Sequence, residues 1–471
     1  MSEPVHPQPL GIFGFPAGLM VLPDDPAADQ VRRGLLAGRL PTDWPEGLRA
    51  HELAYAGDEG AALAALADEP TDDPLTRYHR WLLDPTTDDP AAVRAGLPAR
   101  LAPLVDVAAA TLGAGPAPTD TEGLEPEVAA LVLAARAAEQ AERGLPGQAG
   151  DLLAAAADRA AEVSPVLAGV LRGNAGLLRR EAADDRAAAD LAAAVEALDS
   201  TDLPEVRAEL LLQRGSLSQE RAASGRGDSR SLLQDAMQHY YDGLQLVDEQ
   251  SAPYLWAALN MNLATAHLAS PMSQASDQLR LGVATQSLRA ARRVYTPEHA
   301  PVPWSTATLN LANALVYTPS THQGDNLVEA VELYEEVLVS GVREHDAQGK
   351  ARLLANQGNA LAHLGAFDHA KAKLVEARYL FETEGDHDSV MAVRGVLDEI
   401  AKATVADPDD ELADLARQAE QMARMPQGDG AFTSGMGVTV TAGDLTGPPP
   451  KPTVTVLEPG QTHPDQQVGS P

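Results

Sequence analysis

The feature that most constrains the fold of this chain is a helical pattern repeated along its second half. Three segments share it: residues 256–268, 304–316 and 350–362. Aligning them places Asn262, Asn310 and Asn356 in register, at a period of about 46 to 48 residues. A weaker member of the set, residues 209–217, lies about one period earlier.

Each of these segments is followed by a polar break and then by a second amphipathic stretch. The second stretches are residues 231–247, 281–294, 327–338 and 370–381. Helix pairs repeated at a fixed period cannot bury their apolar faces alone, so they stack on one another. The sequence therefore predicts an all-α chain built as an α-solenoid, a superhelix of helical hairpins.

The first half of the chain carries the same kind of pattern without a clear period. Ala- and Leu-rich stretches alternate with breaks at Pro or Gly, and their apolar residues recur at i, i+3 and i+4, as expected for amphipathic helices. Examples are residues 60–67, 126–143, 148–163 and 186–198. Aromatic residues make up only 4% of the chain, which favours close-packed helices over sheets. Asp73 before Pro74 and Asp89 before Pro90 are expected to be turn and N-cap residues rather than calcium ligands.

Residues 354–377 resemble a tetratricopeptide repeat (TPR). In that family, a small residue of the first helix packs against the second helix, a Gly opens the turn, an aromatic residue follows, and two Ala lie on the second helix. The matching residues here are Gly358, Gly365, Phe367, Ala370 and Ala377. Small residues are needed where two helices approach closely, and Gly suits the tight turn. A fainter match covers residues 126–160.

The middle repeats depart from the TPR pattern in length. The family period is about 34 residues, and these repeats carry roughly a dozen more in the turn between their two helices. The extra residues are 270–280 and 318–326. Such long-turn repeats are similar to those found beside caspase-like (CHAT) protease domains, but the chain has no Cys, so the resemblance does not imply protease activity here.

These patterns divide the chain into five predicted parts. An N-terminal segment, residues 1–45, is rich in Pro and Gly, and its apolar stretch 10–22 is expected to dock in extended form on the first helices. The other parts are degenerate helical repeats at 46–204, TPR-like repeats at 205–403, a capping helix at 404–425 and a disordered tail at 426–471.

A search for catalytic and cofactor motifs gives no candidate site. The absence of Cys excludes thiolate metal sites and a Cys nucleophile, and the chain has no phosphate-binding loop, H-E-x-x-H motif or nucleophile elbow. His363, His369 and His387 fall in one repeat, but helix-surface histidines are more often solvated than metal ligands. We expect a non-enzymatic protein without a cofactor or a bound metal.

The net charge excludes further classes of function. With 68 acidic and 35 basic residues the chain carries a formal charge of −33, which opposes binding to nucleic acid. The N-terminus lacks a basic signal-peptide region, and Gly and Pro interrupt the stretch 10–22, so we expect a cytoplasmic protein that does not engage a membrane. Most of the charge is expected to be a solvated surface, with a preference for basic client segments as the alternative.

The TPR resemblance also implies a binding site. In that family the first helices line a concave groove in which Asn side chains hold a peptide backbone, because an amide both donates and accepts hydrogen bonds. The groove candidates here are Asn262, Asn310, Asn313, Tyr317, Arg352, Asn356, Asn359 and His363. For the three in-register residues, Asn262, Asn310 and Asn356, a ladder of hydrogen bonds between neighbouring repeats is an equally good interpretation.

The expected function is therefore protein–protein interaction. We expect a scaffold, adaptor or client-specific chaperone that binds a peptide or protein in the groove of its repeats. The alternative is a regulatory TPR protein that binds a small ligand or a signal peptide. The sequence identifies neither the client nor the oligomeric state.

Overall fold

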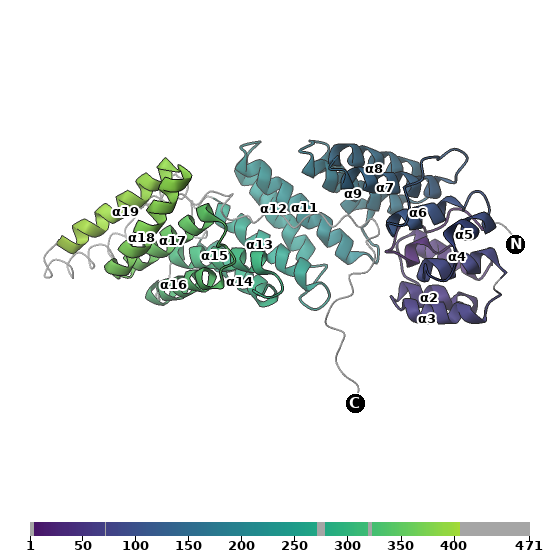
Figure 1. Cartoon of the computed structure of the whole chain (residues 1–471), viewed down its shortest axis with the longest axis horizontal. Coiled ribbons are helices and arrows are strands. Elements are labelled where there is room, and N and C mark those ends of the chain that lie inside the picture. Colours follow the sequence, from purple (N-terminus) through teal and green to yellow (C-terminus); the bar gives the residue numbers. More distant parts are fainter. Residues whose placement is uncertain (1–3, 71, 271–277, 319–322, 406–471) are drawn as a thin grey trace, which may run out of the picture. The chain divides into compact units, whose positions relative to one another are not determined.

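The computed structural model describes residues 4–70, 72–270, 278–318 and 323–405 (Figure 1). All regular secondary structure in these residues is helical, with helices α1 to α19 and three short 3₁₀ helices. Consecutive helices pack against each other, as in an α-solenoid, so the predicted fold class is confirmed. The chain forms two compact units that divide at Arg214 and Gly215, within one helix, and each unit is described by itself.

Six of the ten α-helices that the structure describes wholly within the first unit begin at proline. Pro at the first position of a helix loses no hydrogen bond and already has a helical φ. Its α-helices are α1 (Ala28–Leu36), α2 (Arg49–Tyr55), α3 (Glu59–Ala65), α4 (Pro74–Leu83), α5 (Pro90–Gly96), α6 (Pro103–Thr111), α7 (Pro126–Glu142), α8 (Pro146–Ala160), α9 (Pro165–Glu181) and α10 (Ala187–Ala197). Asp73 and Asp89 cap α4 and α5 by accepting backbone N–H bonds, as predicted from the sequence.

The apolar N-terminal stretch is buried in this unit. Leu10 and residues 19–22 are at most 1% exposed, and most of them share one core with α2 to α7. An extended backbone buried among helices has no ladder of its own, so side chains must bond its polar groups. The Tyr78 hydroxyl donates to the Leu19 carbonyl at 3.0 Å, and the Val21 N–H donates to Nε2 of His79 at 3.0 Å. Nε2 of His51 bonds the Val21 carbonyl at 3.2 Å.

The predicted N-terminal segment is not extended throughout, because Ala17–Leu19, within the apolar stretch, form a 3₁₀ helix and the segment also contains α1. Val31 and Leu35 lie one helical turn apart and are buried with Leu22 and Leu48 in a small separate cluster. Burial of this one apolar face explains α1, although Pro and Gly flank it closely in the sequence.

The second unit repeats one helical hairpin. After α11 (Pro204–Ala223), which crosses the boundary, it contains α12 (Ser229–Leu244), α13 (Pro253–Ala269), α14 (Gln278–Val294), α15 (Pro301–Tyr317), α16 (Gln323–Ser340), α17 (Ala347–His363), α18 (Phe367–Glu384) and α19 (His387–Val405). All helices predicted here from the repeat pattern are present, each longer or shifted by only a few residues. We call α13, α15 and α17 the first helices, and α14, α16 and α18 the second helices, of their hairpins.

The first helices lie closer together than the second helices. α13 contacts α15, α15 contacts α17, and α17 contacts α19. No contact of that extent joins successive second helices within the described ranges. In a stack of hairpins, the helices that approach each other line the inner side of the curve. The first helices of this unit therefore form its inner surface.

Two glycines in the last complete hairpin explain its close packing. A Cβ on Gly358 would lie 2.7 Å from Cγ of Leu374 on α18, so the two helices approach too closely for a side chain there. Gly365 has φ +75° in the turn that follows α17, a conformation that favours glycine. Both residues have the local role predicted for them.

Two further predictions concern the C-terminal residues and the absence of membrane-spanning helices. Residues 404 and 405 end α19, whereas the rest of the predicted capping helix and the predicted disordered tail lie outside the described residues. Within the part of the chain that the structure describes, no helix combines the length and apolar character needed to cross a membrane.

Candidate functional site

The candidate binding residues lie on the first helices α13, α15 and α17. We call the side of these helices that carries Asn262, Asn310, Asn313, Asn356 and Asn359 the first-helix face. None of the three helices contains an Asp or a Glu, although the whole chain contains 68 acidic residues. The polar groups available on this face are therefore mainly amides and hydroxyls.

Asn313 and Asn356 join two consecutive hairpins. Oδ1 of Asn313 on α15 accepts a hydrogen bond from Nδ2 of Asn356 on α17 at 3.1 Å. The same oxygen accepts from the hydroxyl of Tyr334 on α16 at 2.6 Å. Tyr334 is 1% exposed, and its burial raises the pKa of its hydroxyl far above the usual value. For this pair the structure shows a bond between neighbouring repeats, and it involves Asn313 rather than Asn310.

A similar bridge links the helices before α14. Gln219 on α11 accepts a hydrogen bond from the buried hydroxyl of Tyr240 on α12 and donates to Oγ1 of Thr265 on α13 at 3.1 Å. The sequence analysis missed Gln219, Thr265 and both tyrosines. Thr265 follows Asn262 by three residues, as Asn313 follows Asn310, so the repeat alignment contained the signal for this position.

The other two in-register asparagines lie on α13 and α15. Nδ2 of Asn262 donates to the Ala258 carbonyl of its own helix at 2.9 Å, and the side chain is half-buried. Asn310 is 1% exposed and lies within α15. Tyr317 is half-buried near Tyr334, and the electrostatic interaction between the two contributes to the raised Tyr334 pKa.

Among the candidate residues, Asn359 on α17 has a hydrogen-bonding group without a partner. It is only 6% exposed, and its Oδ1 atom is buried without any donor among the described residues. On the first helices, Oε1 of Gln357 and Nδ1 of His267 are also buried without a described partner. Leaving a buried polar atom unpaired costs about 1 to 3 kcal/mol, so such atoms call for an explanation. An acceptor held ready for a bound donor is one such explanation.

Asn359 belongs to a polar stripe along α17. Arg352, Asn356, Asn359 and His363 follow each other at intervals of three or four residues, which places them on one helix face. The charge of Arg352 helps to lower the pKa of Asp386, which precedes α19. His363 keeps an exposed edge, but desolvation of its ring lowers its pKa, and the charge of Glu399 on α19 opposes this. This part of the stripe therefore faces α19.

Replacing Asn313 with Ala is expected to destabilise the second unit by about 1 to 3 kcal/mol, because the buried Tyr334 hydroxyl loses its acceptor. Urea denaturation followed by far-ultraviolet circular dichroism measures the change. The matched control is Asn262→Ala, which removes only a bond within one helix and should change stability by about 0.5 kcal/mol or less. Equal effects of the two substitutions would contradict a bridging role for Asn313.

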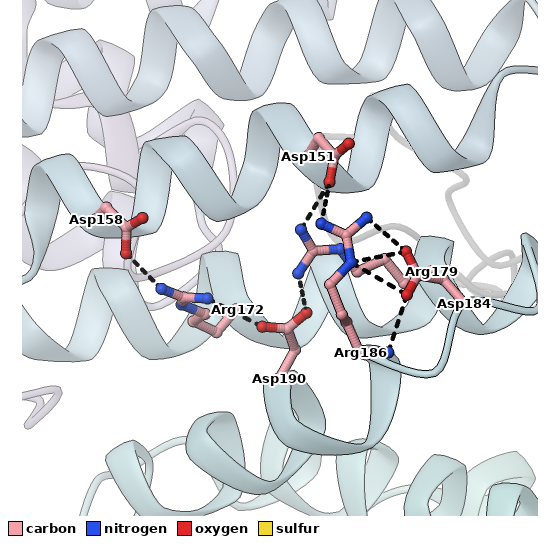
Figure 2. Close-up of polar contacts among 7 residues, drawn as sticks. All are labelled: Asp151, Asp158, Arg172, Arg179, Asp184, Arg186 and Asp190. Carbon is pink, nitrogen blue, oxygen red and sulfur yellow. Dashed lines mark hydrogen bonds and ion pairs between the residues drawn. The ribbon is translucent and has the colours of Figure 1, made fainter.

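The densest group of charges lies elsewhere, in the first unit (Figure 2). It connects α8, α9 and α10 and consists of Asp151, Asp158, Arg172, Arg179, Asp184, Arg186 and Asp190. At its centre the guanidinium of Arg179 bonds the carboxylate of Asp190, and both side chains are about 5% exposed. Nη1 of Arg172 lies 3.0 Å from the other oxygen of Asp190. We call these seven residues the ion-pair network.

The outer members of the ion-pair network are paired as well. Asp151 bonds Arg179 at 2.8 Å and Arg186 at 3.0 Å, and Asp158 bonds Arg172. The guanidinium of Arg186 holds the pKa of Asp184 at about 2. Because each of the four carboxylates already pairs with an arginine, we interpret the network as a connection between three helices and not as an open binding site.

The search for metal-ligating residues gives no second candidate. In the described ranges, no three or more His, Asp and Glu side chains are arranged so that they could hold a metal ion. His363, His369 and His387 are thus not brought together as a ligand set. The first-helix face, with Asn359, remains the candidate site.

Comparison with known proteins places the chain in no family. No protein-family model matches it, and a search of curated proteins finds no match.

Proposed function

We propose that this protein is a non-enzymatic interaction scaffold, an adaptor or client-specific chaperone that holds a peptide or protein segment on the first-helix face. Three features support the proposal. The second unit is a stack of helical hairpins, an architecture that presents extended inner surfaces to partners. Its first helices form that inner surface, and they carry amide side chains in register.

The observation that carries the proposal is the unpartnered Oδ1 of Asn359. Three other candidate amides form hydrogen bonds within the fold: Asn262 within its helix, and Asn313 with Asn356 between helices. Asn359 alone among these positions has a buried acceptor without a donor. A main-chain N–H of a bound segment would satisfy it, as expected for a binding residue that reduces the stability of the free protein.

This proposal predicts opposite effects on stability and binding. In Asn359→Leu, a residue of similar size replaces the unpaired amide, so the free energy of unfolding should stay unchanged or rise by about 1 kcal/mol. The same substitution should abolish capture of a partner. The measurement is affinity capture from an extract of the source organism, read by mass spectrometry, together with urea denaturation of the purified variant.

The matched control is Gln238→Leu, which changes an exposed amide on α12, outside the first-helix face, whose bond lies within its own helix. A partner lost with Asn359→Leu and retained with Gln238→Leu would support the site. A loss of stability in Asn359→Leu would show that the amide is structural. Identical capture by all three proteins would contradict the proposed site.

A second candidate function is the binding of a small ligand, as in a regulatory sensor. A cavity of about 310 Å³ lies where α16 ends and α17 begins, with apolar walls from Val337, Leu338 and Leu353. Concave sites that combine apolar walls with a few polar groups are typical of small-molecule binding.

Charged side chains also line this cavity, from Arg343, Glu344 and Lys350. Arg343 pairs with Asp346 and Lys350 with Glu376. Nε of Arg343 is buried without an acceptor among the described residues. A rise in melting temperature on adding a protein-free metabolite extract, lost in Lys350→Gln, would favour this function.

A further inference from the structure

The acidic residues of the second unit are distributed unevenly between its two layers of helices. The first helices α13, α15 and α17 contain none, whereas the second helices contain nine, all of them on α16 and α18 and none on α14. The nine are Asp325, Glu329, Glu332, Glu335, Glu336, Asp368, Glu376, Glu382 and Glu384. Several of these carboxylates pair with cations of neighbouring second helices, such as Glu329 with Arg289 and Glu335 with Lys373.

The two charged side chains on the first helices, apart from His, are both basic. Lys350 and Arg352 lie near the beginning of α17, where Lys350 already pairs with Glu376 of α18 at 3.2 Å. Arg352 interacts with Asp386. The helices α13 and α15 carry no Asp, Glu, Lys or Arg. A basic side chain laid on this face would therefore leave water without finding a carboxylate from these helices. Burying a cation without a partner costs several kcal/mol, whereas a neutral main chain can bond amides and hydroxyls.

The net charge of the whole chain, in contrast, favours basic partners. A charge of −33 attracts cations from a distance and would favour basic segments in a first encounter. That attraction is screened over about 8 Å at physiological ionic strength, while contacts made on a half-buried surface are screened much less. The local composition of the face should therefore decide which segment stays bound.

From this distribution we propose that the segment held on the first-helix face is an extended peptide that carries no Lys or Arg and is uncharged where it lies over α13 and α15. This inference rests on the proposed function and specifies the partner's chemistry. It is opposite to the preference for basic clients that the net charge alone suggests.

The test uses the full chain and three phage-displayed libraries of random dodecapeptides. The libraries are matched except for their charged residues: one contains only Lys and Arg, one only Asp and Glu, and one neither. Selection at about 0.3 M NaCl suppresses long-range attraction. We expect the library without charges to be enriched about tenfold or more over the basic one.

A charge placed on the face should reverse this preference. In Asn262→Asp, a peptide selected from the uncharged library should bind several-fold more weakly than to the wild type, and its version with one added Lys should bind more tightly than to the wild type. The matched control is Val375→Asp, which adds the same charge at an exposed position on α18. This control should leave both affinities unchanged.

The outcomes separate the inference from the proposed function. Enrichment of the basic library would overturn the inference and leave the scaffold function standing. Equal effects of Asn262→Asp and Val375→Asp would overturn it as well, because the bound peptide would then lie elsewhere. If no library is enriched on the wild type relative to Asn359→Leu, the proposed function itself fails.

Discussion

Replacing Asp190 with Ala is expected to destabilise the first unit by about 3 to 5 kcal/mol, because it leaves buried arginine charges without their central partner. Asp190 is about 5% exposed and bonds both Arg172 and Arg179. Arg179 is itself about 6% exposed and has one further ion pair, with the half-exposed Asp151. Truncation at Asp190 therefore removes the only deeply buried carboxylate of the ion-pair network.

The measurement is urea denaturation followed by tryptophan fluorescence in a Trp256→Phe, Trp304→Phe background. The two remaining tryptophans, Trp44 and Trp81, both belong to the first unit, so the signal reports on that unit alone. The matched control is Asp158→Ala. Asp158 pairs with the same Arg172 but is 69% exposed, so its loss should change stability by about 1 kcal/mol or less.

A third variant distinguishes the effect of removing one carboxylate from the contribution of the whole buried part of the ion-pair network to stability. Replacing Arg172, Arg179 and Asp190 together by Met, Met and Leu should be close to neutral, since buried ion pairs contribute little beyond apolar side chains of similar volume. If Asp190→Ala destabilises no more than Asp158→Ala, the network is solvated in solution and does not connect the three helices as proposed.

The sequence predicted the helices far better than the contacts between them. Periodic apolar residues and prolines fix where a helix begins and which face is apolar, so α15 was expected at 304–316 and is found at Pro301–Tyr317. The bond from Asn356 to Asn313 depends on how far one helix is displaced along the next. That displacement is set by packing of side chains from three helices, and no single-sequence pattern contains it.

The N-terminal segment also shows that contacts between residues far apart in the sequence could not be predicted. Its many Pro and Gly residues and its apolar stretch predicted an extended segment docked on helices, and residues 19–22 are indeed buried. Which side chains bond its backbone was not predicted, since His51 and His79 lie 30 and 58 residues from Val21 in the chain. Nothing in the sequence marks these two histidines, and they affect the stability of the first unit only because the fold buries them.

Burial of these histidines should make the stability of the first unit depend strongly on pH. His51 and His79 lie with their rings 5.0 Å apart and bond the carbonyl and the N–H of Val21. Burial lowers the pKa of His51 from 6.5 to about 4, and burial, helped by the neighbouring His51, lowers the pKa of His79 well below 6.5. Nε2 of His79 must stay unprotonated to accept the Val21 N–H, so both rings are neutral in the folded state.

The direction of the effect follows from which state binds more protons. Above pH 6.5 both histidines are neutral in the folded and the unfolded chain, and neither affects stability. As the pH falls below 6.5, the two histidines bind protons in the unfolded chain but not in the folded chain, so stability falls until the pKa of the folded state is reached. At about pH 5 this amounts to about 2 kcal/mol for each histidine, or about 4 kcal/mol for the pair. Glu209 acts against the two histidines, because burial raises the pKa of its carboxyl, which therefore takes up a proton in the folded chain at a higher pH than in the unfolded chain.

Two further groups act mainly outside this range of pH. The pKa of His6 is raised by its hydrogen bond to Glu127, so its contribution is complete below pH 6.5 and is lost as the pH rises above that value. The pKa of Glu127 is lowered, because its bonds to His6 and to the Gln8 N–H outweigh its burial, and its contribution is lost only as the pH falls below 4.5. Between pH 6.5 and about 5, His51 and His79 should dominate the loss of stability of the first unit.

Urea denaturation of the first unit, followed by fluorescence of Trp44 and Trp81 as above, should therefore show a midpoint that falls steeply between about pH 6.5 and 5. In the double variant His51→Gln, His79→Gln, the amides can still bond Val21 but do not titrate, so the midpoint should become nearly independent of pH over this range. His369→Gln, at an exposed position of the second unit, should leave the wild-type dependence intact. A wild-type midpoint that does not change with pH, or a slope that persists in the double variant, would show that these two histidines are not the groups that make the first unit sensitive to acid.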